Sequence, residues 1–130
     1  MSRSKLAMTA SLVCATLSGA PSLANDQYQT FSSPELKEGR AIWLATCAGC
    51  HGYGIAGAPI PMKPPEWAPR LAKKKSTLYR HAIEGFFGDK GTMMPPRGGN
   101  DDLSDADVQL AVDYMVALAK FHQRATTPQN

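Results

Sequence analysis

The sequence has 130 residues, enough for one small domain, and its 43% hydrophobic content is that of an ordinary globular chain. The formal net charge is only +3 at pH 7, and part of it lies at the extreme N-terminus. Bulk charge therefore gives no reason to expect a protein that binds nucleic acid.

Residues 1–24 have the three-part pattern of a cleaved secretory signal. Arg3 and Lys5 supply the positive region, residues 6–17 supply the apolar region, and residues 22–24 supply the small side chains that a signal peptidase reads. Cleavage there removes two of the 14 basic residues and none of the 11 acidic ones, so the mature charge is 12 − 11 = +1. We expect a periplasmic mature domain, residues 25–130.

Two other interpretations of this segment fit less well. An uncleaved membrane anchor needs roughly 20 apolar residues, whereas several Ser and Thr, together with Gly19 and Pro21, interrupt this stretch. A lipoprotein would use Cys14 as its lipid acceptor, but Val13 precedes it where a small residue is expected. We therefore expect no stable membrane insertion of the mature form.

The mature chain opens with polar residues 25–32, which we expect to form a loose lead-in. A helix is predicted from Ser33, a good N-cap that Pro34 follows, to the end of the sequence CAGCHG. Ser32 with Glu35 also fits a capping box.

One face of this predicted helix carries residues at helical spacing: Leu36, Gly39, Trp43, Cys47 and Cys50. Glycine inside a helix costs up to about 1 kcal/mol relative to alanine. We take the close approach of another helix as the reason for Gly39.

Five prolines in residues 54–69 exclude a long helix and a central strand, so we expect an ordered loop or extended segment there. A short helix capped by Ser76 follows, and residues 89–102, rich in Gly and Pro, form a second loop.

The last predicted helix begins after Ser104, with Asp107 closing a capping box, and ends near Gln123. No alternating strand pattern occurs anywhere in the sequence. These elements predict an all-α domain in which loops hold much of the chain.

The stretch CAGCH, with Cys47, Cys50 and His51, fits three kinds of site. A structural zinc site needs four ligands, but the mature chain has no third cysteine, and His81 and His122 are far apart. A thiol redox pair opens a helix after a strand, whereas this motif closes a helix. Covalent haem needs two thiols for the vinyl groups and a histidine beneath the iron, which these five residues supply.

A second axial ligand is expected from methionine, whose soft thioether favours ferrous iron. Met94 is preferred because rigid Pro95 follows it, although the adjacent Met93 is an alternative. Met62 would have to reach around the haem with little slack, and Met115 fits the buried stripe of the last helix.

Several motifs together resemble the class I cytochromes c, and more narrowly the bacterial cytochrome c-five type. They occur in the order of that family: CAGCHG (47–52), GAP (57–59), W-x-x-R (67–70), GFFG (85–88), MPPRGG (94–99) and LSDADV (103–108). The resemblance implies N- and C-terminal helices that cross around one covalently bound haem c, with long Pro/Gly loops.

The same resemblance implies thioether links at Cys47 and Cys50 and iron ligands at His51 and Met94. Some family members carry a cysteine pair after the Gly-Gly, whereas Asn100 and Leu103 stand at those places here. We therefore do not expect that disulfide.

The resemblance also points to residues around the haem. The carbonyl of Pro59 would accept the second ring N–H of His51, as metal-bound histidines require. Trp67 and Arg70 would donate hydrogen bonds to a haem propionate.

The expected function is one-electron transfer without catalysis, between redox protein partners that bind transiently. One alternative is a haem-bearing subunit of a larger dehydrogenase complex, and a dehydrogenase or oxidase complex is also a candidate partner. Another alternative is an open-site haem enzyme or gas sensor.

Overall fold

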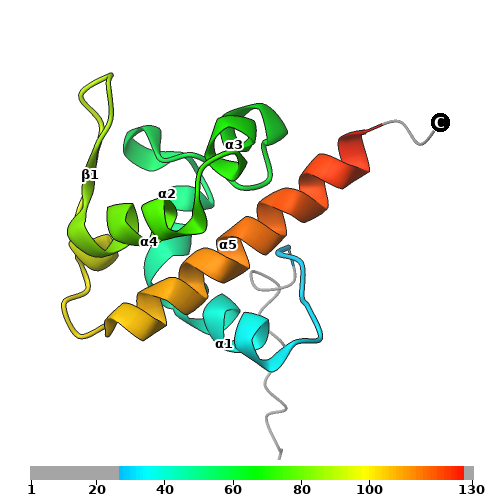
Figure 1. Ribbon diagram of the computed structural model, residues 1–130, viewed down its shortest axis with the longest axis horizontal. Helices are drawn as coiled ribbons and strands as arrows, with labels where there is room; N and C mark the ends of the chain where they lie inside the picture. The colour runs from blue at the N-terminus through cyan, green and yellow to red at the C-terminus, as the bar shows by residue number, and fades with distance from the viewer. Residues whose placement is uncertain (1–26, 128–130) are drawn as a thin grey trace, which may run out of the picture.

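The computed structural model describes residues 27–127, so the predicted signal segment and its cleavage site lie outside the described residues. Helices dominate this part of the chain, which confirms the predicted all-α fold (Figure 1). The elements are α1 (Pro34–Ile42), η2 (Trp43–Cys47), α2 (Ala48–His51), η3 (Ile55–Gly57), α3 (Pro64–Leu71), α4 (Lys75–Glu84), β1 (Phe86–Phe87), β2 (Met93–Met94), η4 (Pro96–Gly99) and α5 (Asp105–Thr126).

The first predicted helix runs through α1, η2 and α2 without a break. Ser33 is its N-cap, as predicted, because its side chain accepts a hydrogen bond from the Leu36 amide at 3.3 Å. The predicted capping box of Ser32 is wrong, since the Ser33 hydroxyl is the group that meets Glu35, at 2.6 Å. The middle stretch, η2, is a π-helix, a widened turn that is frequent at functional sites.

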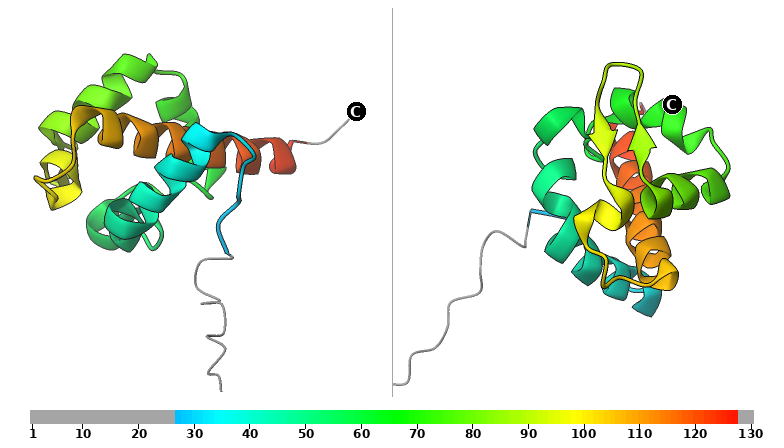
Figure 2. Two further views of the ribbon diagram at one scale, coloured as in Figure 1. Left: turned by 90° about the horizontal axis from the view of Figure 1, so that it is seen from below. Right: turned by 90° about the vertical axis from the view of Figure 1, so that its left-hand side faces the viewer.

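Helices α1 and α5 cross closely, as Figure 2 shows from two sides, and Gly39 lies at the contact. A Cβ atom added at Gly39 would lie 2.1 Å from the carbonyl oxygen of Leu110. Next to this contact, Trp43 and Tyr114 are fully buried with ring centroids 5.6 Å apart. The absence of a side chain at Gly39 therefore lets the two helices close over the aromatic core, as the sequence predicted.

Helix α5 is the longest helix in the described part of the chain and forms one side of the core. The predicted capping box is confirmed: the Ser104 hydroxyl accepts from the Asp107 amide at 3.1 Å, and the Asp107 carboxylate accepts from the Ser104 amide at 2.9 Å. Most of its apolar side chains are buried, including Met115, which the sequence assigned to the core. None of the helices within residues 27–127 is long and apolar enough to cross a membrane.

The lead-in before α1 is packed rather than loose. Tyr28 is only 4% exposed, and its ring meets Trp43 edge to face at 4.7 Å. The Tyr114 hydroxyl donates to the Gln29 carbonyl at 2.9 Å, which ties the segment to α5. The expectation of a loose lead-in is therefore wrong, because the aromatic residue in this polar stretch reaches the core.

The expected loop at residues 54–69 is wrong in its last third, which forms helix α3. Pro64 and Pro65 occupy its first positions, where a missing N–H costs nothing. Pro69 lies inside the helix. The next helix also begins differently from the prediction, since Lys74 rather than Ser76 is the N-cap of α4.

The described chain also contains a small hairpin that the sequence did not predict. Strands β1 and β2 pair antiparallel, with Phe86 opposite Met94 and Phe87 opposite Met93. Two residues per strand are too few to produce an alternating pattern. The hairpin is nevertheless the element that carries Met94.

The α1–α5 contact predicts opposite effects for two Gly-to-Ala changes. Gly39→Ala should lower the free energy of unfolding of the haem-loaded protein, because overpacking costs about 1–3 kcal/mol and exceeds the gain of up to about 1 kcal/mol in helix propensity. Gly49→Ala, where an added Cβ meets nothing within 4 Å, should leave it unchanged or raise it. Denaturant unfolding measures both, and equal values for the two variants would contradict the prediction.

Candidate functional site

The motif CAGCH lies at the end of the first long helix. Cys47 is partly buried and Cys50 is exposed, and both are free thiols. Burial, and then the nearby Cys50, raise the pKa of the Cys47 thiol to about 11. A redox pair needs a thiolate at neutral pH, so this environment does not suit one.

His51 is buried, with 8% of its surface exposed. Its Nδ1 lies 2.9 Å from the carbonyl oxygen of Pro59, so Nδ1 carries the proton that is donated to this oxygen. Burial lowers the pKa of His51, and the Pro59 carbonyl acts against this while Arg70 adds to it. The result is a neutral ring with Nε2 left to bind a metal.

The Pro59 carbonyl is held in place by a residue that the sequence analysis missed. The Glu66 carboxylate accepts a hydrogen bond from the Ile60 amide at 2.8 Å, which fixes the peptide unit that follows Pro59. This amide lowers the pKa of Glu66, with Lys63 contributing at 3.4 Å. The only sequence signal was an acidic residue after the two prolines that begin α3.

Trp67 and Arg70 both lie on α3. Trp67 is 4% exposed, and its indole N–H is buried without a hydrogen-bond partner in the described chain. Leaving such a donor unpaired costs about 1–3 kcal/mol, so an acceptor outside the polypeptide would stabilise it. Arg70 donates from Nη1 to the Glu66 carbonyl. The Trp43 indole N–H also lacks a partner, but it lies in the α1–α5 core.

The hairpin holds Met94 and Met93 differently. Met94 is partly buried and packs against the core, whereas Met93 is 55% exposed. The turn before β1 requires glycine at Gly85, because its φ is +87° and a Cβ there would meet the Met94 carbonyl oxygen at 3.0 Å. Met62 is also partly buried against the core.

These residues fit a covalently bound haem. Haem attachment and ligation need particular donor groups, and the site supplies them. They are two free thiols, an adjacent histidine whose Nδ1 is bonded to a carbonyl, a buried indole N–H without a partner, and a partly buried thioether. Within residues 27–127, no three His, Cys, Asp or Glu side chains gather as a structural zinc site would require.

The Glu66 contact predicts a pH-dependent contribution to stability. Its pKa is lowered from 4.5 in the folded protein, so its contribution is present above pH 4.5 and is lost as the pH falls through the lowered value. Glu66→Ala should therefore reduce the free energy of unfolding by about 1 kcal/mol at pH 7. This value is kept low because 38% of the Glu66 side chain is exposed, where solvent screens its charge. The difference from the natural chain should disappear at low pH.

Glu38→Ala, at an exposed position on α1, is the matched control for that measurement. It should have little effect at either pH. A Glu66→Ala difference that stays constant with pH would exclude the ionised carboxylate as the cause.

Comparison with known proteins agrees with this site. Residues 34–115 match the family described as cytochrome c oxidase, cbb3-type, subunit III. Cytochrome c-555 of Chlorobaculum tepidum is 48% identical over 82 residues, covering 63% of this chain and 75% of that protein. Cytochrome c-555 of Chlorobaculum thiosulfatiphilum is 45% identical over 82 residues, covering 63% and 94%.

A solved structure agrees with the fold. The chain matches a cytochrome c from a crystal structure of an electron-transfer complex of nitrite reductase with cytochrome c, with a TM-score of 0.56 and 33% identity. The match covers 67% of this chain and 96% of that one. With the CxxCH spacing of Cys47, Cys50 and His51, these similarities show that the chain belongs to the cytochrome c family and is a monohaem electron-transfer protein with covalently bound haem c.

Proposed function

We propose that this cytochrome is exported to the periplasm, where it carries single electrons between proteins that bind it transiently, with His51 and Met94 as axial ligands. The hydrogen bond from His51 to Pro59 carries the proposal, because it leaves one ring nitrogen of a buried, neutral imidazole for iron. When bound, haem c supplies an iron that exchanges one electron between its ferrous and ferric states.

The residues of CAGCH would supply the attachment points of the haem and the first iron ligand. Cys47 and Cys50 would hold the haem through thioethers to its two vinyl groups, and His51 would bind the iron through Nε2. The Glu66–Ile60 contact keeps the Pro59 carbonyl in place, and this carbonyl keeps the imidazole in one orientation. A ring held in this way does not have to move when the iron changes its oxidation state.

Met94 is the second axial ligand in this proposal. It is supported by the partial burial of Met94 against the core, the exposure of its neighbour Met93 and the rigid Pro95 that follows. With His51 and Met94 as its protein ligands, the iron would have no open position for a substrate. This arrangement favours an electron carrier over an open-site enzyme or gas sensor.

Trp67 and Arg70 have a supporting role. The buried indole N–H of Trp67 needs an acceptor, and a haem propionate would provide one. Arg70 uses Nη1 for the Glu66 carbonyl, and its other N–H groups would add a charge-assisted bond to the same propionate.

Export is supported by the signal pattern of residues 1–24, with residues 25–130 as the mature domain. A second candidate is a haem-bearing subunit of a larger dehydrogenase or oxidase complex, and the description of the matching family as an oxidase subunit favours it. A free carrier is instead supported by the solved relative, which was crystallised as an electron-transfer complex with nitrite reductase.

Isolation of the untagged protein from cells that produce it naturally tests export and distinguishes a free carrier from a complex subunit. We expect it in the periplasmic extract, with the intact mass of residues 25–130 plus one haem, and in a fraction free of other proteins. A mass that includes residues 1–24 would contradict cleavage. A partner that co-purifies at a fixed ratio would favour the complex subunit.

The sixth ligand is tested by replacing each neighbouring methionine. Met94→Ala should abolish the weak far-red thioether–iron band of the oxidised protein and allow carbon monoxide to bind the reduced protein at neutral pH. Met93→Ala is the matched control and should change neither, because its side chain is mostly exposed. A Met94→Ala protein that kept the band would point to Met93 or Met62 instead.

A further inference from the structure

We propose that Arg97 is a positioning residue for the Met94 ligand. It holds residues 94–99, the ligand loop, against the start of α5 and so keeps external ligands from displacing Met94. This inference rests on the proposed ligation by Met94. Arg97 follows Met94 by three positions, with the stiff pair Pro95–Pro96 between them, so a restraint on Arg97 also restrains Met94.

The backbone at Arg97 is in a conformation that residues with a side chain seldom adopt. Its φ and ψ are 54° and 25°, in the left-handed region, and Gly98 continues this conformation with φ 65°. A non-glycine residue persists there only where its surroundings hold it. Glycine would fit this backbone more easily, so the arginine side chain must contribute something that glycine cannot.

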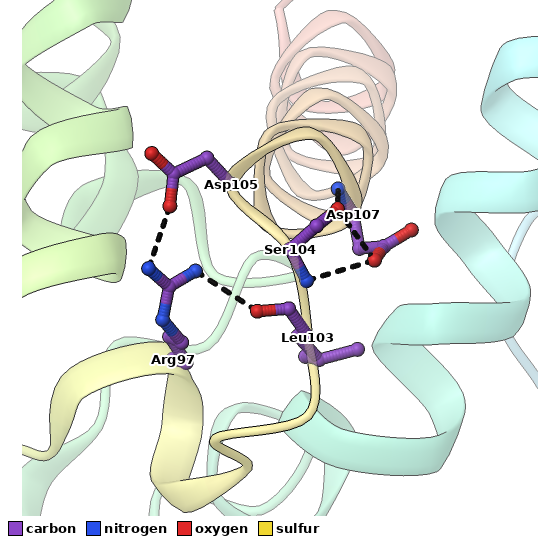
Figure 3. Close-up of polar contacts among 5 residues, drawn as sticks. All are labelled: Arg97, Leu103, Ser104, Asp105 and Asp107. Carbon is purple, nitrogen blue, oxygen red and sulfur yellow. Dashed lines mark hydrogen bonds and ion pairs between the residues drawn. The ribbon is translucent and has the colours of Figure 1, made fainter.

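That contribution is a fork of two hydrogen bonds, which Figure 3 shows. Arg97 Nη1 donates to the Leu103 carbonyl at 2.9 Å, and Nη2 donates to the Asp105 carboxylate at 2.6 Å. The Arg97 side chain is 26% exposed and that of Asp105 is 63% exposed, so the bond to the Leu103 carbonyl is the better shielded of the two. Two acceptors on one planar guanidinium fix its position as well as its charge.

The two acceptors lie at the start of α5, where Leu103 precedes the N-cap Ser104 and Asp105 is the first residue of the helix. The capping box of Ser104 and Asp107 satisfies the first turn of this helix, and α5 then packs along α1 through the core. Figure 3 places the Arg97 fork on one side of this turn and the capping box on the other. Arg97 therefore connects the ligand loop to a rigid part of the molecule.

The opposite end of the ligand loop is held less firmly. There Met94 belongs to a ladder of only two residue pairs, and so small a hairpin is marginally stable by itself. Gly85 packs against the Met94 carbonyl but adds no side-chain bond. The Arg97 fork is thus the strongest polar tie described for this loop, and its loss should let the loop open more often.

The experiment measures how readily imidazole replaces the methionine ligand of the oxidised, haem-loaded protein, read by loss of the far-red band. Arg97→Gly fits the same backbone conformation and removes both hydrogen bonds of the fork. It should raise the affinity for imidazole by at least about tenfold, because the loss of one charge-assisted hydrogen bond alone corresponds to about that factor. Arg97→Lys keeps the charge without the fork and should give a smaller rise. Asp105→Asn should change the affinity in the same direction.

Ser104→Ala is the matched control, since it removes the cap of the same helix turn without touching Arg97. It should lower thermal stability and raise the imidazole affinity less than Arg97→Gly does, because both Arg97 hydrogen bonds remain. If Ser104→Ala raises the affinity as much as Arg97→Gly does, or if Arg97→Gly binds imidazole like the natural chain, the inference is overturned.

Met94→Ala in the same assay separates the two proposals. Retention of the far-red band in that variant would remove Met94 as the ligand and this inference with it. Loss of the band, together with an unaffected Arg97→Gly, would leave the ligand assignment standing and overturn only the role of Arg97.

Discussion

The close crossing of α1 and α5 at Gly39 is the constraint on which the rest of this cytochrome depends. The carbonyl of Leu110 lies where a side chain of residue 39 would be, so the two helices meet backbone to backbone. From this contact, α1 continues through η2 to His51, whereas the start of α5 receives the Arg97 fork. In the proposed haem site, the segment with His51 therefore continues from α1, and the segment with Met94 is tied to the start of α5.

A second tie joins these halves directly. The side-chain amide of Asn100 donates to the Thr46 hydroxyl at 3.4 Å, next to Cys47. The Leu103 carbonyl accepts from the Arg97 side chain, and the Leu103 amide donates to the Asn100 carbonyl at 3.3 Å. The resemblance noted in the sequence places the cysteine pair of some family members at positions 100 and 103. Here hydrogen bonds constrain the segment, and because they are weaker than a covalent bond, the ligand loop depends more on Arg97.

The sequence predicted those features that local chemistry determines. Ser33 and Ser104 were identified as caps because a hydroxyl in that position satisfies the first turn whatever surrounds it. The capping box expected at Ser32 and the cap expected at Ser76 were local errors. The loose lead-in was an error of long-range packing, because Tyr28 is ordered by Trp43, which lies 15 residues further along the chain. Glu66 was missed because only the folded chain shows that its carboxylate meets the Ile60 amide.

Proline favours order in two different kinds of segment near the site, a helix and a loop. In α3, two prolines occupy the first positions of the helix, where the N–H groups that they lack would have no partner within the helix. In the ligand loop, Pro95 and Pro96 reduce the freedom of the unfolded chain, so ordering the loop costs less entropy. An electron carrier benefits from such stiffness, because ligands that keep their positions in both oxidation states leave little to rearrange when an electron arrives.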